Sequence, residues 1–305
     1  MASSLKNVAI IGASGSIGKI ILDGLVTSAQ FTITVISRKE SEATFPSDVV
    51  VHKTDFSGAG LEAALKGQDA VISVVGAAGF GEQKKIVDAA IRAGVKRFIP
   101  SEFSASSQNE AVLHLLPLFG QKKELVEYLK TKESGGLSWT GIATSLLFDW
   151  RLLQQGLGNG ILEFDIANRK ATIWDSGEKS FTLTNEKQLA RSVVSVLQHP
   201  QETSNKYLYV ASVETTQKDI LAALEETMKT QWTVTETSTD AEISGGVKRL
   251  SAGDFSGAIT LVRATAFGNT PGLHANYAKE ETLANEMLGL SLESVQDTVQ
   301  RVVGQ

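Results

Sequence analysis

The sequence has no cysteine among its 305 residues, which excludes disulfides and thiolate metal ligands. This composition is compatible with a reducing compartment. Histidine is also rare, and no two of the four histidines have the spacing of metal ligands on one helix. They are His52, His114, His199 and His274. We therefore predict no metal site.

Long apolar runs and an excess of positive charge are missing too. No apolar run approaches the roughly 20 residues of a membrane span, and the opening residues MASSLKN lack an apolar signal core. We expect a cytoplasmic protein without a membrane partner. The 29 basic and 34 acidic residues give a net charge of -5, which disfavours a nucleic-acid partner. A small-molecule substrate remains, with the chain a monomer or a homodimer.

Short apolar runs alternate with helical patterns through the first half of the chain. Six runs read as buried strands, and they lie at residues 6–11, 31–39, 45–52, 69–76, 95–103 and 137–145. Helical periods fall between them, near residues 17–26, 61–66, 84–93 and 122–132. Strands that alternate with helices in this way predict βαβ units in a doubly wound parallel sheet. The predicted fold class is α/β, with an NAD(P)-binding Rossmann fold and a smaller substrate lobe.

Three glycines follow the first predicted strand at intervals of three residues, in the stretch IIGASGSIGK. Gly12 permits a tight turn, Gly15 lets the backbone approach a pyrophosphate, and Gly18 allows close helix packing. The helix that follows offers free N–H groups to phosphate, and Ser14 and Ser16 add hydroxyl donors. The predicted dinucleotide-binding residues of this loop are Gly12, Ser14, Gly15, Ser16 and Ile17.

The end of the second predicted strand distinguishes the two nicotinamide cofactors. An acidic residue there would bind the ribose 2′-hydroxyl of NAD, whereas this chain has Arg38 and Lys39. Two cations suit a 2′-phosphate, so we predict NADPH/NADP+ as the cofactor. The alternative is that both side chains only solvate a loop. Asp55, near the adenine, and Gly76 and Ala77, along the ribose, complete the predicted cofactor contacts at the strand ends.

The regular alternation ends after Trp150. We predict a dinucleotide-binding domain formed by residues 1–148 and 184–212, interleaved with a substrate lobe formed by residues 149–183 and 213–305. Residues 206–212 are expected to return to the main sheet. Residues 230–257, rich in Ser, Thr and Gly, predict a mobile cover, and helices are expected at 217–229, 278–288 and 292–303. A lobe that closes over the nicotinamide would exclude water.

Several motifs together resemble the isoflavone reductase-like, or NmrA-like, branch of the atypical short-chain dehydrogenases, including its fungal members. They are the glycine spacing of residues 12–18, ALKGQDAVISVVG, the segment from Gln83 through KKIVDAAIRAGVKRFIPSEF, and ANRKATIWDSGEKSFTLTNEKQLARSVVSVL. The resemblance extends from about Val8 to Ser212. It implies NADPH-dependent reduction of a small, often aromatic, secondary metabolite.

Short-chain dehydrogenases usually carry a Tyr-x-x-x-Lys motif, and the chain offers two candidate lysines. Tyr128 and Lys132 have that spacing, but they lie toward the end of their helix that is distant from the strand termini. The resemblance instead places the catalytic lysine at Lys122, three residues after Phe119, with Leu118 at the usual tyrosine position. Lys123 remains the alternative. The arginine pair that follows the lysine in the family is absent, since Val126 and Glu127 stand there.

Further site residues are expected where the fifth and sixth predicted strands end. Ser101 and Phe103 are predicted to contact the cofactor, and Glu102, Phe148 and Trp150 to line the substrate pocket. The alternatives are a structural corner at residues 101–103 and core packing for the aromatic residues. Two functions remain open: an NADPH-dependent reductase, and a non-catalytic redox sensor that binds NADP(H) and a protein partner.

Overall fold

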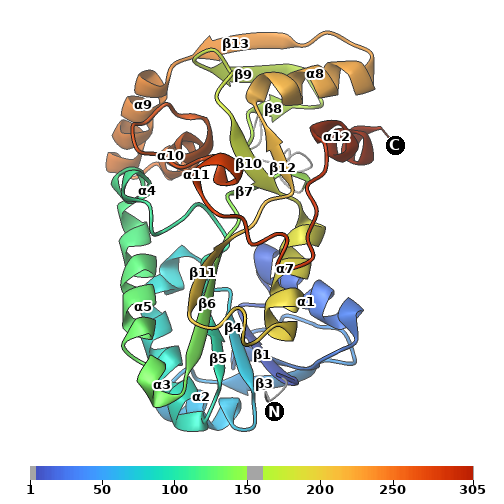
Figure 1. The fold of residues 1–305 in the computed structure, drawn as a ribbon. Coiled ribbons are helices and arrows are strands. Elements are labelled where there is room, and N and C mark those ends of the chain that lie inside the picture. The colour runs from blue at the N-terminus through green and yellow to red at the C-terminus, as the bar shows by residue number, and fades with distance from the viewer. Residues whose placement is uncertain (1–4, 150–160, 305) are drawn as a thin grey trace. The chain divides into compact units, whose positions relative to one another are not determined.

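The computed structural model describes residues 5–149 and 161–304, coloured along the chain in Figure 1. The chain divides into two compact units. Unit 1 consists of Met1–Phe103, Gly120–Ile142 and Leu189–Leu208, and unit 2 of Ser104–Phe119, Ala143–Gln188 and Tyr209–Gln305. Because three segments build each unit, the interleaving of two bodies is a property of the tertiary structure. Each unit is described by itself below.

The sheet of unit 1 has seven strands in the order β11-β6-β5-β4-β1-β2-β3. Its strands are β1 Asn7–Ile11, β2 Thr32–Arg38, β3 Val50–Thr54, β4 Ala70–Ser73, β5 Arg97–Ile99, β6 Ser138–Ala143 and β11 Lys206–Tyr209. Strands β1 to β6 pair in parallel, with Ile10 of β1 opposite Val35 and Ile72. This order confirms the predicted doubly wound sheet and the return of residues 206–209 to it.

The helices of unit 1 follow the strands in the expected alternation. They are α1 Ser16–Ser28, α2 Gly58–Leu65, α3 Gln83–Ala93, α5 Gly120–Lys130 and, from Leu189 on, α7 Glu186–Gln198. Short 3-10 turns add η1 Ala77–Glu82 and η3 Glu133–Gly135. Fully buried apolar residues of the strands, such as Val71 and Phe98, pack against Ile86 of α3 and Leu125 of α5. Burial on both faces explains why these strands read as continuous apolar runs.

Unit 2 has two small sheets, in the orders β12-β10-β7 and β13-β9-β8. Their strands are β7 Leu146–Leu147, β8 Phe164–Asp165, β9 Lys170–Trp174, β10 Phe181–Thr184, β12 Val213–Thr215 and β13 Thr233–Thr237. The helices are α4 Glu110–Leu115, η2 Pro117–Phe119, α8 Gln217–Met228, α9 Thr239–Ser251, α10 Ser256–Phe267, α11 Tyr277–Glu280 and α12 Val295–Val303. Trp174, Phe181 and Phe267 form a buried aromatic group in the core of this unit.

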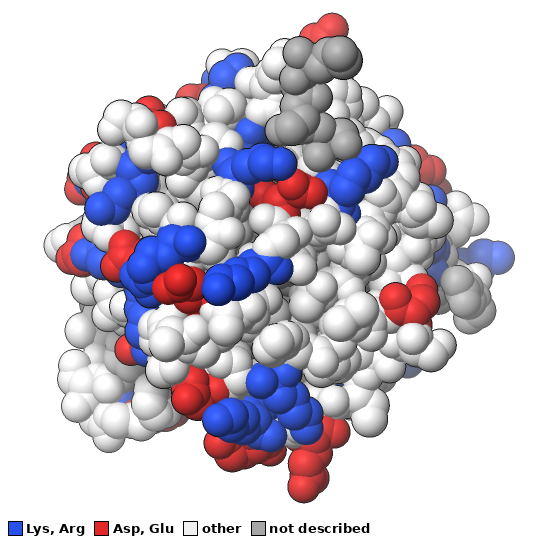
Figure 2. Space-filling model, turned by 90° about the horizontal axis from the view of Figure 1, so that it is seen from below, with Lys and Arg blue, Asp and Glu red and all other residues white. Residues whose placement is uncertain are grey.

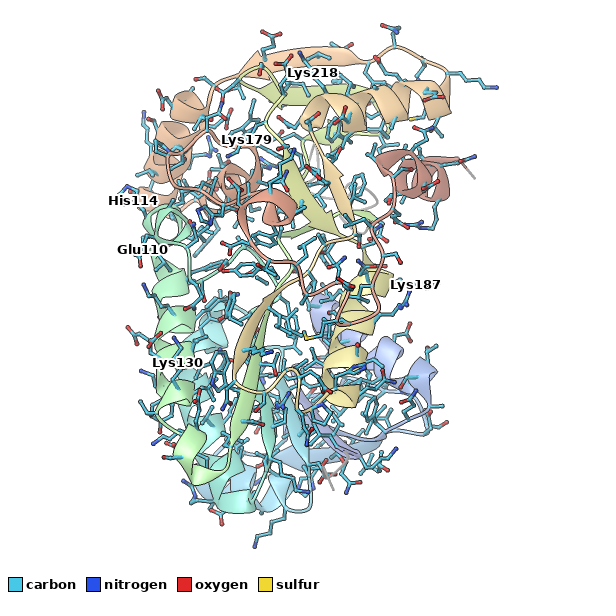
Figure 3. All side chains as sticks on the ribbon, viewed as in Figure 1. Glu110, His114, Lys130, Lys179, Lys187 and Lys218 are labelled. Carbon is cyan, nitrogen blue, oxygen red and sulfur yellow. The ribbon has the colours of Figure 1, made fainter. Side chains whose placement is uncertain are left out.

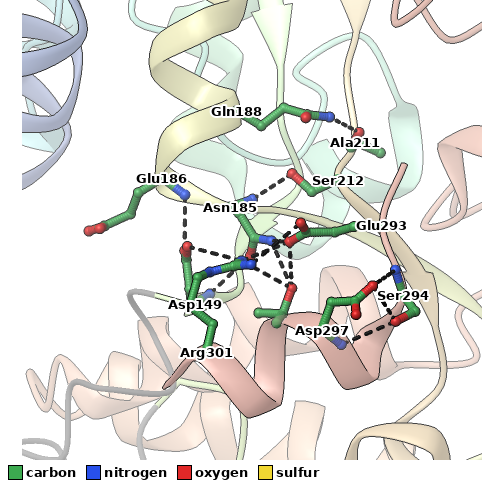
Figure 4. A network of polar contacts seen from close by, with 11 residues as sticks. Asp149, Asn185, Glu186, Gln188, Ala211, Ser212, Glu293, Ser294, Asp297 and Arg301 are labelled. Atoms are coloured by element: carbon green, nitrogen blue, oxygen red, sulfur yellow. Dashed lines mark hydrogen bonds and ion pairs between the residues drawn. The ribbon is translucent and has the colours of Figure 1, made fainter. Parts of the chain in front are cut away.

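A polar network in unit 2 attaches the segment around α12 to the start of α7 (Figure 4). The Asn185 amide donates to Glu293 Oε1 and, over 2.8 Å, to Thr298 Oγ1. Arg301 pairs with the same Glu293 carboxylate at 2.7 Å and lies 4.0 Å from Asp149. The bonds of Asn185 join residues 108 and 113 positions apart, so sequence periodicity gives no indication of them.

Two expectations about local structure differ from the structure. The third strand begins at Val50 rather than in residues 45–49, because its pairing with β2 starts at Thr34 opposite Val50. Within residues 230–257, the chain forms β13, which pairs with β9, and α9, which Ser238 caps by accepting from the Ala241 amide. A mobile cover formed by this segment stays a prediction. The helix expected at 278–288 is the single turn α11, which ends at Glu280.

The contact-based units also differ in detail from the predicted domains. Residues 104–119 and 143–148 belong to unit 2, where Val112, Leu115 and Phe148 enter its apolar core. The assignment of one body to the cofactor and the other to the substrate remains a prediction.

Lysine and arginine side chains are interspersed with aspartate and glutamate on the face shown in Figure 2. Across residues 5–149 and 161–304, no helix combines the length and apolarity that crossing a bilayer requires. The same residues contain no group of three or more His, Cys, Asp or Glu side chains arranged to hold a metal ion.

Candidate functional site

The glycine loop between β1 and α1 leaves no room for side chains at two of its positions. Gly12 has φ +88°, and a Cβ there would collide with the carbonyl oxygen of Val74. A Cβ on Gly18 would collide with the carbonyl of Gly12, so α1 packs directly on the turn. These close approaches give the glycine spacing its physical reason.

The N-terminus of α1 is open to a ligand. Gly15 is its N-cap and has no side chain to accept from the first-turn amides, while Ser14, Gly15 and Ser16 are exposed. First-turn N–H groups and the positive end of the helix dipole suit a phosphate. A pocket of about 620 Å³ adjoins the loop and is lined by Ala13, Ser14, Lys19, Leu22, Asp23 and residues 42–46. Sequence reasoning missed Lys19, whose spacing from the loop gave no signal.

The two cations after β2 have different surroundings. Arg38 is exposed, and across the part of the chain that the structure describes no ion pair involves it. The Lys39 ammonium lies 3.9 Å from the carboxylate of Asp55. Asp55 also accepts from the Ser57 amide at 2.9 Å, and hydrogen bonds from Ser57 and the charge of Lys39 lower the pKa of this exposed carboxyl. Asp55 thus helps to start α2.

The edge formed by the ends of β1, β4 and β5 brings several predicted residues together, because these strands are parallel. Gly76 and Ala77 are exposed at the start of η1. Ser101 is mostly buried, and its hydroxyl donates to the Val75 carbonyl over 2.8 Å. Glu102 and Phe103 are buried beside it.

Lys122 enters this edge from α5. Its side chain is only 4% exposed, and Nζ donates to the Glu102 carbonyl over 3.1 Å. The amine lies 4.8 Å from the centre of the Phe80 ring. Burial lowers the pKa of Lys122 to about 8, against the opposing effect of the Glu102 charge. An amine with this pKa can hold or release a proton near neutral pH.

The other candidate lysines have different environments. Lys123 lines a separate pocket with Lys84 and Glu124. The Tyr128 hydroxyl donates to Asp88 of α3, and the Lys132 ammonium lies 4.5 Å from the Tyr128 ring. Tyr128 lies in the last turn of α5, which ends at Lys130 (labelled in Figure 3), and Lys132 lies two residues beyond that end.

The remaining predicted pocket residues lie in unit 2 or outside the described residues. Phe148 is completely buried in the apolar core of unit 2, so its side chain stabilises that core, and its place in a substrate pocket stays a prediction. Leu118, at the position of the usual tyrosine, is exposed in η2. Trp150 falls outside the described residues.

The residues at this edge fit a phosphorylated dinucleotide. The cradle around Gly12 and Gly18 would be filled by any added Cβ, and α1 presents its uncapped amides there. Arg38 adds a positive charge beside β2, and Lys122 adds an amine beyond β5. The loop and Arg38 would hold the phosphates, while the amine would lie toward the reactive ring.

The chain is similar to a known protein family and to fungal proteins named as oxidoreductases. A family model described as the NmrA-like family matches residues 4–244. The chain is 34% identical to "Oxidoreductase aprR" from Aspergillus flavus, over 97% of this chain and 98% of that protein. It is 33% identical to "Oxidoreductase poxI" from Penicillium oxalicum, over 95% of this chain and 92% of the relative.

Solved structures share the fold at lower identity. The complex of leucoanthocyanidin reductase with NADPH from Vitis vinifera superposes with a TM-score of 0.79 at 16% identity, covering 98% of this chain and 100% of that one. The structure of AtPrR2 with NADP+ and (+)pinoresinol gives a TM-score of 0.77 at 18% identity, covering 99% and 100%. The family match and the fungal relatives confirm the resemblance drawn from the residues, and the chain belongs to the NmrA-like family.

Proposed function

We propose that the chain is an NADPH-dependent oxidoreductase that reduces a small, conjugated or aromatic metabolite. The observation that carries this proposal is the buried amine of Lys122 at the same sheet edge as the glycine turn. When bound, NADPH supplies the hydride. Relatives named as oxidoreductases, and a shared fold with NADPH and NADP+ complexes, support the same assignment.

The chain's own residues would perform three tasks in this reaction. The glycine turn and the start of α1 bind the pyrophosphate. Arg38, more than the Asp55-paired Lys39, binds the 2′-phosphate and so selects NADPH over NADH. Lys122 orients the cofactor from the end of β5, and its Nζ exchanges a proton with the substrate as the product forms.

The substrate class rests on the neighbours. The AtPrR2 structure holds (+)pinoresinol beside NADP+, and another structure with the same fold is a leucoanthocyanidin reductase. We therefore propose a small aromatic substrate with a conjugated or carbonyl acceptor. Unit 2, with its aromatic core, is the part of the chain that we assign to substrate binding.

The test is substrate-dependent oxidation of NADPH across a panel of aromatic carbonyl and conjugated metabolites, with Lys122→Ala beside the wild type. Turnover that is lost in Lys122→Ala while NADPH binding persists would support the enzyme. Cofactor binding without turnover on the whole panel would contradict it and favour a dinucleotide sensor.

The cofactor preference has its own test. Arg38→Ala is expected to raise the Kd for NADPH about tenfold or more and to leave the Kd for NADH nearly unchanged. Lys39→Ala should have a smaller effect because Asp55 already neutralises part of its charge. Lys66→Ala, an exposed lysine at the C-cap of α2, is the matched control. Equal losses for both cofactors in Arg38→Ala would overturn the assignment.

A further inference from the structure

The Lys122 amine is linked through Glu102 to Tyr207, and the proposed function does not use this link. Glu102 is completely buried, and its carboxylate Oε2 accepts a hydrogen bond of 2.6 Å from the hydroxyl of Tyr207. The backbone carbonyl of the same residue accepts from Lys122 Nζ over 3.1 Å. Glu102 therefore offers the amine both a carbonyl dipole and a nearby negative charge. Glu102 is 20 positions from Lys122 in the sequence, and Tyr207 is 105 positions from Glu102.

The backbone of strand β6 is shaped to seat Tyr207. Gly141 lies within β6, where a Cβ would approach the Tyr207 ring at 2.7 Å from Cδ2 and 3.0 Å from Cε2. Real Cβ contacts essentially never reach 2.7 Å, so a side chain at this position would force the Tyr207 ring or the strand to shift. Glycine inside a strand weakens it, and it marks a close approach. Here the close approach allows the Tyr207 hydroxyl to reach the Glu102 carboxylate.

The turn that carries Glu102 is braced from its other side. Gln83, the first residue of α3, is completely buried, and its Oε1 accepts from the Ser101 amide over 3.0 Å. The Ser101 hydroxyl donates to the Val75 carbonyl, and the Glu102 amide donates to the Pro100 carbonyl over 2.8 Å. The backbone of residues 100–102 is thus held by three bonds, and its carbonyl has little freedom to leave Lys122.

We propose that Glu102, anchored by Tyr207, is the positioning residue for the Lys122 amine, and this inference rests on the proposed function. The amine bonds the Glu102 carbonyl, and the charge of the buried Glu102 carboxylate favours its ammonium form, so removing that charge leaves the buried amine less compensated. Glu102 has no exposed surface in this structure, and its predicted place in the substrate pocket stays a prediction.

Other ionisable groups on the neighbouring elements have partners of their own. Glu82, at the end of η1, pairs with Lys85 at 2.5 Å. On α3 and α5, Lys84 pairs with Glu124 at 3.3 Å, and Asp88 accepts from Tyr128. Glu102, which follows β5, accepts from the Lys122 amine through its carbonyl and from Tyr207 of β11 through its carboxylate.

The experiment follows the titration of Lys122 in the full chain. Protein labelled with 13C at lysine Cε gives one resonance per lysine, and the Lys122→Met variant assigns that of Lys122. The wild-type midpoint is expected near 8. Glu102→Gln, nearly identical in shape, should move the midpoint downward, because the charge that favours the ammonium form is gone.

Two variants test the bond from Tyr207 to Glu102, and a third is a control for the loss of a carboxylate charge. Tyr207→Phe and Gly141→Ala should move the midpoint in the same direction by a smaller amount, because the carboxylate is no longer held close. Glu127→Gln removes a carboxylate from the exposed face of α5, where it pairs with Lys130, and should leave the midpoint unchanged. Thermal unfolding verifies that each variant is folded.

The outcomes separate this inference from the proposed function. A shifted midpoint in Glu102→Gln supports the inference even where no substrate is turned over. With an active substrate, kcat should also fall about tenfold or more at unchanged NADPH affinity. If the Lys122 midpoint and kcat both stay at wild-type values in folded Glu102→Gln and Tyr207→Phe, the inference is wrong while the proposed function stands.

Discussion

The two ends of α5 carry similar residue types in opposite surroundings. At its start, Lys122 is buried and its amine bonds a backbone carbonyl beside the β5 terminus. About 9 Å further along the helix axis, Tyr128 bonds Asp88 and stacks with Lys132, as on an ordinary helix surface. The Tyr-x-x-x-Lys spacing occurs at the second end and the buried amine at the first. Burial and partners, not spacing, identify the lysine suited to chemistry.

The largest difference between the two ends of α5 is expected when each lysine is removed in turn. Lys122→Met should reduce substrate-dependent NADPH oxidation about 10³-fold, because a positioned acid–base group is lost. Lys132→Met should retain activity within about twofold. Steady-state rates with an active substrate measure both. Equal losses would show that the two ends do not differ in function.

The pH dependence of the free energy of unfolding also distinguishes the two lysines, and it needs no substrate. The pKa of Lys122 is lowered to about 8 in the folded chain, whereas an unfolded lysine titrates near its ordinary value of 10.5. Between these values the unfolded state binds more protons, so the free energy of unfolding rises as pH rises. The full difference is on the order of 3 kcal/mol.

Urea unfolding at pH 7.5, 9 and 10 tests this expectation by comparing the wild type with Lys122→Met. The wild type should gain stability relative to Lys122→Met as the pH increases. Lys132→Met should follow the wild type throughout. A pH-independent difference between the wild type and Lys122→Met would mean that the amine is not desolvated.

Changes near the C-terminal end of α5, where Tyr128 lies, should lower the free energy of unfolding without affecting turnover. Tyr128→Phe removes the hydroxyl that donates to Asp88, and we expect a loss of about 1 kcal/mol in the free energy of unfolding. NADPH binding and turnover should remain at wild-type levels. A large loss of turnover in Tyr128→Phe, with the fold intact, would restore the Tyr128 and Lys132 pair as the catalytic one.

The smallest effect is expected on the exposed face of the same helix. Glu127 pairs with Lys130 at 2.8 Å, with both side chains about half exposed. Glu127→Gln should change the free energy of unfolding by less than about 0.5 kcal/mol, because solvent and salt screen the pair. Thermal unfolding at low and high salt measures this change, and a loss above 1 kcal/mol would indicate a role beyond the surface pair.

Local patterns predicted much of unit 1 and less of unit 2. The strand runs around Ile10, Val35 and Ile72 alternate with amphipathic helices, so the parallel sheet follows from neighbouring residues. In unit 2 short strands pair across long separations, as β13 does with β9, and such pairing has no local signature. The strand β13 and its pairing with β9 were therefore not predicted.

The candidate site divides in the same way. The glycine turn and the cations after β2 could be predicted because their spacing itself expresses their geometry. Gly141 gave a usable signal, since a glycine inside an apolar strand indicates close approach, yet its partner could not be named. Tyr207 and Lys19 gave none, because only the folded chain brings them to Glu102 and to the pocket beside the loop.

Local sequence patterns were enough to predict the parallel sheet, the turn at Gly12, the cations at Arg38 and Lys39 and the family of the chain. Only the folded chain shows that Lys122 rather than Lys123 is buried against the Glu102 carbonyl, and that Tyr207 bonds the Glu102 side chain. The two kinds of feature differ in how far apart in the sequence the interacting residues lie. Periodicity and turn chemistry act within a few residues, whereas desolvation and buried hydrogen bonds depend on groups that meet only when distant segments pack together.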